Sequence, residues 1–369
     1  LMKTLYYHQP HTLLNRALRL LQTIIQRKGI LSLFTTLTIL LLPLSVQGQT
    51  SNKILINSGW EMQDAAIISK EGMKAGWEME NAAKVPQEGK VISTTKYKPS
   101  GWYKATVPGT VLTTLVNNGV YPEPLYGENN RPEVIPEYLC HTDWWYRNEV
   151  MIPDSYKNKT IWLNFDGINY SADIWVNGHR VGPIKGAFIR GNFDITSFVK
   201  PGQTAIIAVR ISPQPNTGVP FEHIMGTVGG PCGGVGRLDG PTFGCSNGWD
   251  WLSGIRDRNS GIWQDVFLSA TGHVLMKDPL ITSDLPLPRT DIASVTVQTT
   301  VQNTTGNVQK GIIKGSFDSI KFEKTIEIAP WRSLTFTFDP KDFAQLNIKN
   351  PKLWWPNGLG EQNLYSMHL

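Results

Sequence analysis

The residues best suited to chemistry in this chain are Trp249, Asp250 and Trp251, which follow one another in a glycine-rich segment. Sugars present apolar faces that stack on aromatic rings and hydroxyl groups that bind carboxylates. A tryptophan beside an aspartate therefore predicts contact with a glycan. The alternative is that both indole rings pack inside a β-sandwich while Asp250 caps a turn, and Trp251 is the better candidate for packing.

The segment that carries these residues runs from Ser212 to Ile262 and contains twelve glycines in 51 positions. Strand-like runs flank it, TAIIAVRIS before and IWQDVFLSA after. A connection of this length inside a domain is usually functional or disordered. Disordered segments are poor in aromatic residues, whereas this one holds Phe221, Phe243 and two tryptophans. We expect an ordered loop that presents Trp249 and Asp250 to a ligand.

Two of the three cysteines, Cys232 and Cys245, lie thirteen positions apart in the same segment. A bridge between them would stabilise the fold by about 3 kcal/mol through loop closure. The sequence equally allows Cys140, Cys232 and Cys245 to be unpaired thiols.

The run Cys140-His141-Thr-Asp143 has no second ligand pair at zinc spacing, so we expect no metal site. The glycines match no nucleotide-binding motif, and we expect no cofactor.

The first 48 residues differ in kind from the rest, with five basic residues, no acidic residue and an apolar run from Ile30 to Leu42. This pattern predicts a secretory signal, because a stretch of thirteen residues falls short of the ~20 that a spanning helix needs. We expect a secreted or periplasmic protein without a membrane contact after cleavage.

The whole chain has 35 basic and 30 acidic residues. The remainder after residue 48 therefore has 30 of each, which gives no reason to expect nucleic acid as a partner.

The elements that must position the candidate residues read as β-strands. From Asp143 onward, alternating runs of apolar and polar residues recur about every ten residues, separated by Gly, Pro and Asn. This spacing predicts an all-β fold. We expect a jelly-roll sandwich over residues 49–270 and a smaller immunoglobulin-like sandwich over 271–369, cut short in its last strand. Asn177-Gly178 predicts a hairpin turn, and Val111–Asn118 predicts two helical turns before Gly119.

Six motifs, in this order, resemble the front half of glycoside hydrolase family 2, most closely its exo-β-glucosaminidase and β-mannosidase branch. They are Val107-Pro-Gly-Thr-Val111, Trp145-Tyr-Arg147 with Asp166-Gly167, Ile174-Trp-Val-Asn-Gly178, Gly248-Trp-Asp-Trp251 with Arg256, Gly261-Ile-Trp263, and Leu353-Trp-Trp-Pro-Asn-Gly358. The resemblance covers roughly residues 54–369. It implies that a (β/α)₈ catalytic barrel, absent from this chain, is a partner of the two sandwiches. It also implies a β-linked oligosaccharide as ligand and a place for Trp249 and Asp250 beside the sugar at the reaction centre.

The resemblance further implies that the catalytic residues are two glutamates on barrel strands, so we expect none in this chain. A retaining glycosidase needs two carboxylates about 5 Å apart. Asn148-Glu149 spells the family's acid/base dipeptide, but it lies in a predicted sandwich strand, so we expect no catalytic role for it. Arg256-Asp257-Arg258 is expected to pair internally or to brace the loop against the barrel, with a solvated charge cluster as the alternative. Trp354-Trp355 is expected to pack at an interface. A second hypothesis is a free-standing carbohydrate-binding module.

Overall fold

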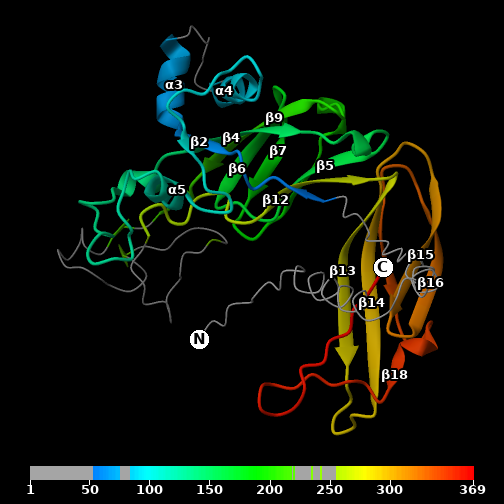
Figure 1. The fold of residues 1–369 in the computed structure, drawn as a ribbon. Helices are drawn as coiled ribbons and strands as arrows, with labels where there is room; N and C mark the ends of the chain where they lie inside the picture. The colour runs from blue at the N-terminus through cyan, green and yellow to red at the C-terminus, as the bar shows by residue number, and fades with distance from the viewer. Residues whose placement is uncertain (1–52, 75–83, 218, 221–233, 236–241, 243–254) are drawn as a thin grey trace, which may run out of the picture. The chain divides into compact units, whose positions relative to one another are not determined.

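The structure is a computed structural model that describes residues 53–74, 84–217, 219–220, 234–235, 242 and 255–369. Within these ranges the chain is built mainly of antiparallel strands with a few short helices (Figure 1). The expected all-β class, with two β-sandwiches, is confirmed. The boundary expected at residue 270 stays a prediction. Among the described helices, none has the length and apolar character needed to cross a membrane.

The first β-sandwich consists of a six-stranded sheet and a four-stranded sheet. The larger sheet has the order β3-β2-β4-β9-β6-β7 and the smaller one β1-β12-β5-β8. In chain order the strands are β1 (Ile54–Leu55), β2 (Glu61–Asp64), β3 (Tyr103–Lys104), β4 (Trp144–Met151), β5 (Thr160–Phe165), β6 (Ser171–Val176), β7 (His179–Lys185), β8 (Gly191–Asp194), β9 (Thr204–Ser212) and β12 (Val266–Thr271). A separate two-stranded pair joins β10 (Val219–Pro220) to β11 (Gly234–Val235).

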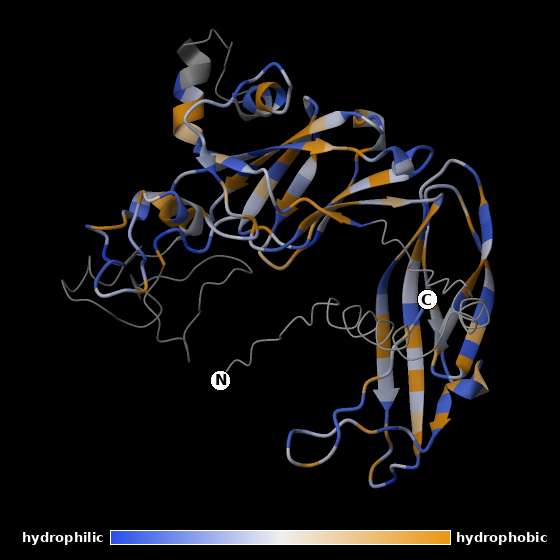
Figure 2. Cartoon of the chain, in the orientation of Figure 1, coloured by the Kyte–Doolittle hydropathy of each residue, from blue (hydrophilic) through white to orange (hydrophobic). Residues whose placement is uncertain are grey.

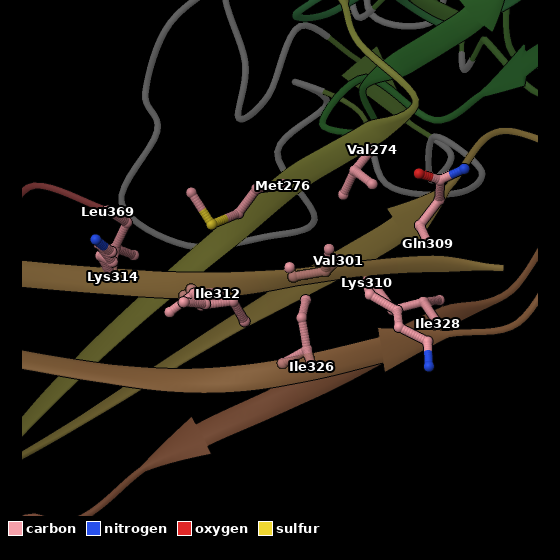
Figure 3. Close-up of a pocket in the computed structure, with 12 residues that line it drawn as sticks. Val274, Met276, Val301, Gln309, Lys310, Ile312, Lys314, Ile326, Ile328 and Leu369 are labelled. Carbon is pink, nitrogen blue, oxygen red and sulfur yellow. The ribbon is translucent and has the colours of Figure 1, made fainter.

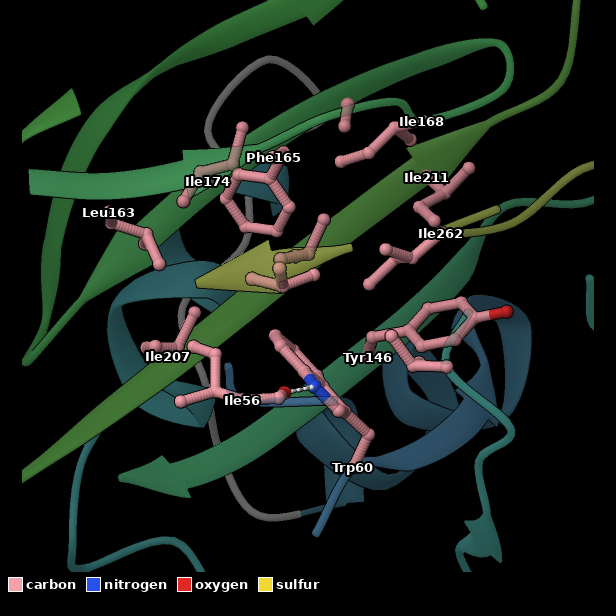
Figure 4. Packing of buried hydrophobic residues seen from close by; sticks show 14 of the residues in the cluster. Ile56, Trp60, Tyr146, Leu163, Phe165, Ile168, Ile174, Ile207, Ile211 and Ile262 are labelled. Carbon is pink, nitrogen blue, oxygen red and sulfur yellow. Dashed lines mark hydrogen bonds between the residues drawn. The ribbon is translucent and has the colours of Figure 1, made fainter. Parts of the chain in front are cut away.

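The two sheets enclose one hydrophobic cluster, to which alternate residues of β5, β6, β9 and β12 contribute; part of it is drawn in Figure 4. Trp60 belongs to this cluster and is 1% exposed, and its indole nitrogen donates a hydrogen bond of 2.6 Å to the Ile56 carbonyl. Because this hydrogen bond pairs the indole nitrogen, the large aromatic side chain is buried without an unpaired polar group. Strands β4 and β9 form the longest ladder of the larger sheet. It has eight residue pairs, from Trp144 opposite Ile211 to Met151 opposite Thr204.

Two helices cover part of the outer face of the six-stranded sheet, and the sequence did not predict them. They are α3 (Ala65–Lys74) and α4 (Lys84–Ile92). A second cluster joins Ala65, Ile68 and Ile92 to Trp145 and Trp175 of the sheet. The two indole rings contact each other with centroids 5.2 Å apart. The central strands of this sheet are therefore covered on both faces, which explains why most residues of β4 and β9 are buried.

The turns that sequence patterns predicted lie where they were expected. Asn177 and Gly178 have φ angles of 49° and 85° and join β6 to β7, because the tight hairpin turn requires positive φ at both positions. Helix α5 (Val111–Asn117) begins where the Thr110 hydroxyl accepts a hydrogen bond from the Thr113 amide. It ends before Gly119, whose φ is 72°. The described residues also include the single-turn 3₁₀ helices η2 (Glu137–Cys140), η3 (Asp154–Tyr156), η4 (Thr196–Phe198) and η6 (Ala344–Leu346).

The second β-sandwich shows the alternation of polar and apolar residues most clearly (Figure 2). Every second residue of β14 (Ile292–Asn303) is buried. Strand β14 pairs with β13 (Val274–Asp284), β17 (Ser333–Phe338) and β18 (Asn347–Lys349), while β15 (Gln309–Phe317) pairs with β16 (Ile320–Ile328). Their inner faces share a core that includes Val297, Phe322 and Phe338.

Candidate functional site

The candidate ligand-binding residues Trp249, Asp250 and Trp251 lie outside the described residues, as do Cys232 and Cys245. Their roles and the expected disulfide stay predictions. What the structure does describe is the frame at the two ends of the segment that contains them. The outgoing end follows β9 as far as Thr217, and the returning end begins at Ile255.

Two arginines and one glutamate join these ends. The Glu137 carboxylate accepts a hydrogen bond of 2.7 Å from Nη1 of Arg256 and one of 2.6 Å from Nη2 of Arg258. Nε of Arg258 donates to the Thr217 carbonyl at 2.8 Å, and Nε of Arg256 donates to the Asn130 carbonyl at 2.8 Å. We call Glu137, Arg256 and Arg258 the arginine–glutamate cluster. It ties the outgoing end of the segment to the returning end.

The arginine–glutamate cluster is buried and therefore has a structural role. Its burial excludes the alternative of a solvated charge cluster. The Arg256 and Arg258 side chains are 0% and 6% exposed, and the Glu137 side chain is 13% exposed. Burial alone raises the pKa of Glu137, but the hydrogen bonds and charges of Arg258 and Arg256 outweigh it and hold the pKa below its ordinary value. The carboxylate is therefore ionised at neutral pH and compensates two buried positive charges.

Asp257, between the two arginines, attaches the returning chain to helix α5. Its Oδ2 accepts a hydrogen bond of 2.7 Å from the Leu112 amide, and its Oδ1 accepts one of 2.9 Å from the Asn259 amide. The side chain is fully buried. Burial raises the pKa of Asp257, while the hydrogen bonds from Leu112, Thr110 and Asn259 act in the opposite direction. The motif at residues 107–111, which leads into α5, also meets the returning end of the segment, since the Gly109 and Val111 amides donate to the carbonyls of Ile262 and Ser260.

Asn169 completes the frame, and sequence reasoning missed it. Its side-chain amide donates to the carbonyls of Arg258 and Asn259, both at 2.9 Å, and its Oδ1 accepts a hydrogen bond of 2.8 Å from Thr242. Its backbone also exchanges hydrogen bonds of 3.0 and 2.9 Å with Gly261. Thr242 belongs to the glycine-rich segment, so Asn169 holds that segment at an additional point. No sequence signal marks Asn169 beyond its position two residues after Asp166-Gly167.

The strand containing Asn148-Glu149 is β4, as expected. The Asn148 side-chain amide donates a hydrogen bond of 2.8 Å to the Ser58 carbonyl. The half-exposed Glu149 carboxylate accepts a hydrogen bond of 2.7 Å from Nη2 of the buried Arg147. Asn148 thus joins β4 to the turn before β2, and Glu149 pairs with a residue of its own strand. This arrangement assigns Glu149 the role of an ion-pair partner of Arg147.

A possible metal-ligand group is formed by Glu137, Cys140 and His141, whose ligand atoms lie within 4.8 Å of one another. Glu137 is already bound by Arg256 and Arg258, and these two positive charges oppose a cation. Burial raises the pKa of the Cys140 thiol, and that thiol donates to the Glu137 carbonyl at 3.1 Å. The chemistry of the group therefore fits a structural contact better than a metal site.

Comparison with known proteins identifies the family. The model for the galactose-binding-like domain of glycosyl hydrolase family 2 matches residues 77–264, half of the chain, and a second model of glycosyl hydrolases family 2 matches residues 274–369. The chain belongs to glycoside hydrolase family 2. The family 2 motifs thus identify the chain correctly, and the branch is also correct, since its relatives include exo-β-D-glucosaminidases and mannosidases.

Two curated relatives of this family 2 chain span 75% of it. The exo-β-D-glucosaminidase of Streptomyces avermitilis is 30% identical over 282 residues, and the mannosylglycoprotein endo-β-mannosidase of Lilium longiflorum is 33% identical over 303 residues. The crystal structure of an exo-chitosanase from Amycolatopsis orientalis matches 85% of the chain with a TM-score of 0.64 and 25% identity. The chain spans 28%, 29% and 31% of these three proteins, respectively.

Proposed function

We propose that this chain is the N-terminal, non-catalytic part of a secreted or periplasmic retaining exo-β-glycosidase that cleaves β-glucosaminides or β-mannosides. The named activities of the relatives support this substrate class. The proposed role of the chain is to support a catalytic barrel and to supply one wall of its sugar pocket. The signal-like first 48 residues support export.

The observation that carries the proposal is the buried frame at the ends of the glycine-rich segment. The arginine–glutamate cluster, Asp257 and Asn169 fix both ends of the segment and an additional point at Thr242. A segment with fixed ends can hold Trp249 and Asp250 in a defined position, which binding requires because ordering a free loop costs affinity. In the proposed pocket the Trp249 ring stacks on the sugar, and Asp250 accepts hydrogen bonds from its polar groups.

The proposal places the catalytic carboxylates outside this chain. A retaining mechanism needs one carboxylic acid and one carboxylate about 5 Å apart on either side of the glycosidic bond. Glu149, which has the family's dipeptide sequence, is bound to Arg147 on the surface of a sheet. Trp354 and Trp355, 56% and 44% exposed, are proposed to pack against the barrel. The chain by itself is then inactive.

A chimera provides the positive test. Residues 53–369 are joined to the remaining part of the exo-β-D-glucosaminidase from Streptomyces avermitilis, and hydrolysis of an aryl β-D-glucosaminide is measured. Asp250→Ala is expected to lower kcat/KM about 100-fold, the usual effect of removing one polar contact to the reacting sugar. Glu149→Gln is the matched carboxylate control and is expected to stay within about twofold. Equal rates for all three chimeras would refute the role of Asp250.

The alternative, a free-standing carbohydrate-binding module, makes a different prediction for the chain alone. A pocket at a domain interface loses a wall when one domain is absent, so the proposal expects no measurable binding of glucosamine or mannose oligosaccharides by calorimetry. Millimolar or tighter binding that disappears in Trp249→Ala and persists in Trp331→Ala would favour the module. Trp331 is a suitable control because it is 69% exposed in the second β-sandwich.

A further inference from the structure

Four Asn-Gly pairs occur in the chain, and the proposed function assigns them no chemistry. They are Asn118-Gly119, Asn177-Gly178, Asn247-Gly248 and Asn357-Gly358. An asparagine before glycine can lose its side-chain amide, because the glycine nitrogen can reach Cγ of the asparagine and glycine has no Cβ to obstruct the approach. Asn247-Gly248 lies outside the described residues. The structure therefore compares three pairs of identical sequence.

The Asn177-Gly178 pair is held by hydrogen bonds at both reacting groups. Its side-chain amide donates a hydrogen bond of 2.7 Å to the Phe198 carbonyl, and its Oδ1 accepts one of 2.8 Å from the Ile206 amide. The glycine N–H donates to the Ser93 hydroxyl at 2.9 Å. The asparagine side chain therefore cannot turn toward the glycine nitrogen without breaking these hydrogen bonds.

The Asn118-Gly119 pair is held in the same way, although Asn118 is exposed. Its side-chain amide donates to the carbonyls of Thr114 at 2.7 Å and Lys104 at 3.0 Å. The glycine N–H donates to the Val116 carbonyl at 2.9 Å. A pair restrained in this manner reacts only when local unfolding releases it, whether or not solvent reaches it.

The Asn357-Gly358 pair has neither restraint. Both residues are exposed, and among the described residues no hydrogen bond engages the Asn357 side chain or the Gly358 N–H. Gly358 has the same φ angle as Gly178, 85°, and a Cβ placed on Gly358 would meet no atom within 4 Å. These two pairs thus differ in their hydrogen bonds and not in the φ angle of the glycine.

The turn that carries Asn357 is held at its base. The Trp355 amide donates a hydrogen bond of 2.9 Å to the Glu361 carbonyl across the turn. Further along the chain, Leu369 lines an apolar groove of the second β-sandwich (Figure 3). The exposure of Asn357 is therefore a property of the folded chain and not of a frayed end.

We propose that Asn357 is a site of spontaneous modification, where the side-chain amide is converted to a carboxylate in the folded protein. The backbone nitrogen of Gly358 forms a bond to Cγ of Asn357, and the side-chain nitrogen leaves as ammonia with the proton of that backbone nitrogen. Water then opens the resulting five-membered imide ring. Breaking the ring bond between nitrogen and Cγ gives aspartate, and breaking the bond to the backbone carbonyl carbon gives isoaspartate.

The modification adds a negative charge close to Trp354 and Trp355 in the sequence. The isoaspartate product also lengthens the backbone by one methylene group, which displaces the Leu359 amide from the Pro356 carbonyl that it now contacts at 3.0 Å. An interface that buries the two tryptophans against a barrel would be weakened by the added charge. That consequence rests on the proposed function, whereas the modification itself does not.

The test compares the three described pairs in the folded 369-residue chain and in the same chain unfolded in guanidinium chloride. Both samples are incubated at mildly alkaline pH, and peptide mass spectrometry follows the mass gain of an amide converted to an acid. Unfolding removes the restraining hydrogen bonds, so the unfolded rate of each pair is its own reference. Asn357 is expected to react within about twofold of its unfolded rate, and Asn118 and Asn177 at least about tenfold below theirs.

The variant Asn357→Gln assigns the signal, because the tryptic peptide that follows Lys352 also contains Asn363. Glutamine would have to form a larger ring, so the mass gain of this peptide should be lost. A mass gain that persists in Asn357→Gln would overturn the proposal. Slowing of Asn357 by folding as strongly as Asn177 would also overturn it, as would folded rates equal to the unfolded rates for all three pairs, since hydrogen bonds would then not decide the reactivity.

Discussion

Replacing Glu137 by glutamine tests whether the arginine–glutamate cluster fixes the glycine-rich segment. The substitution keeps the shape of the side chain and removes the charge that compensates Arg256 and Arg258. Removing one partner of a buried ion pair costs about 3–5 kcal/mol. We take the lower value, about 3 kcal/mol, because Glu137 is 13% exposed and glutamine keeps one acceptor oxygen. For a domain of this size such a loss lowers Tm by about 6–12 °C.

The assay is equilibrium unfolding in urea, followed by near-ultraviolet circular dichroism, of the original chain and of Glu137→Gln. The matched control is Glu327→Gln, which removes a carboxylate that pairs with Lys310 at 3.0 Å on the surface, where both side chains are more than half exposed. The free energy of unfolding of this control should change by less than about 0.5 kcal/mol. A loss below 1 kcal/mol for Glu137→Gln would refute the inference that the cluster supports the segment.

The pH dependence of the same measurement has a defined sign. The pKa of Glu137 is lowered in the folded protein from an ordinary value of 4.5. Its stabilising contribution is therefore complete above that value and is lost as the pH falls through the lower folded pKa. The difference in unfolding free energy between the original chain and Glu137→Gln should be constant at neutral pH and shrink in acid below 4.5. A difference that stays constant in acid would show that charge is not its cause.

Three further predictions concern the first β-sandwich. Asn169→Ala should lower the free energy of unfolding by about 2–3 kcal/mol in urea, because the Arg258 and Asn259 carbonyls lose a buried donor; a change under 0.5 kcal/mol would contradict this. Gly89→Ala should destabilise the chain in the same assay despite alanine's higher helix propensity, because the added Cβ would lie 2.2 Å from Cε2 of Trp175; stabilisation would disprove the packing of α4. Cys140→Ser should leave the number of rapidly reacting thiols in the native protein unchanged, since the Cys140 thiol is buried and its pKa raised; one fewer reactive thiol would contradict its burial.

The strands and their turns could be predicted from the sequence because their signals are local. The alternation in β14 and the Asn177-Gly178 turn of β6 and β7 depend only on neighbouring residues. Helix α5 was also expected, because Gly119 marks the end of the run from Val111. The family motifs added what local patterns do not contain, namely the order of the domains and the relation to glycosidases.

Helix α4 and the frame of the candidate site could not be predicted because they depend on tertiary contacts. Helix α4 contains Pro86 and Gly89, two residues that disfavour helices, and Gly89 is suited to its place because Trp175 packs closely against it. The Arg256-Asp257-Arg258 run was interpreted as a brace, but its partner Glu137 lies about 120 residues earlier in the chain. Spacing along the sequence does not reveal a pairing of that kind.

The central proposal, that this chain is a non-catalytic part of a glycosidase, is tested most directly by a turnover measurement on the chain itself. Release of 4-nitrophenol from the β-D-glucosaminide and the β-D-mannoside is followed for the 369-residue chain and for Asp250→Ala. The account predicts no release above the Asp250→Ala control with either substrate. Sustained turnover by the original chain that Asp250→Ala abolishes would contradict it, because the catalytic carboxylates would then lie within these 369 residues.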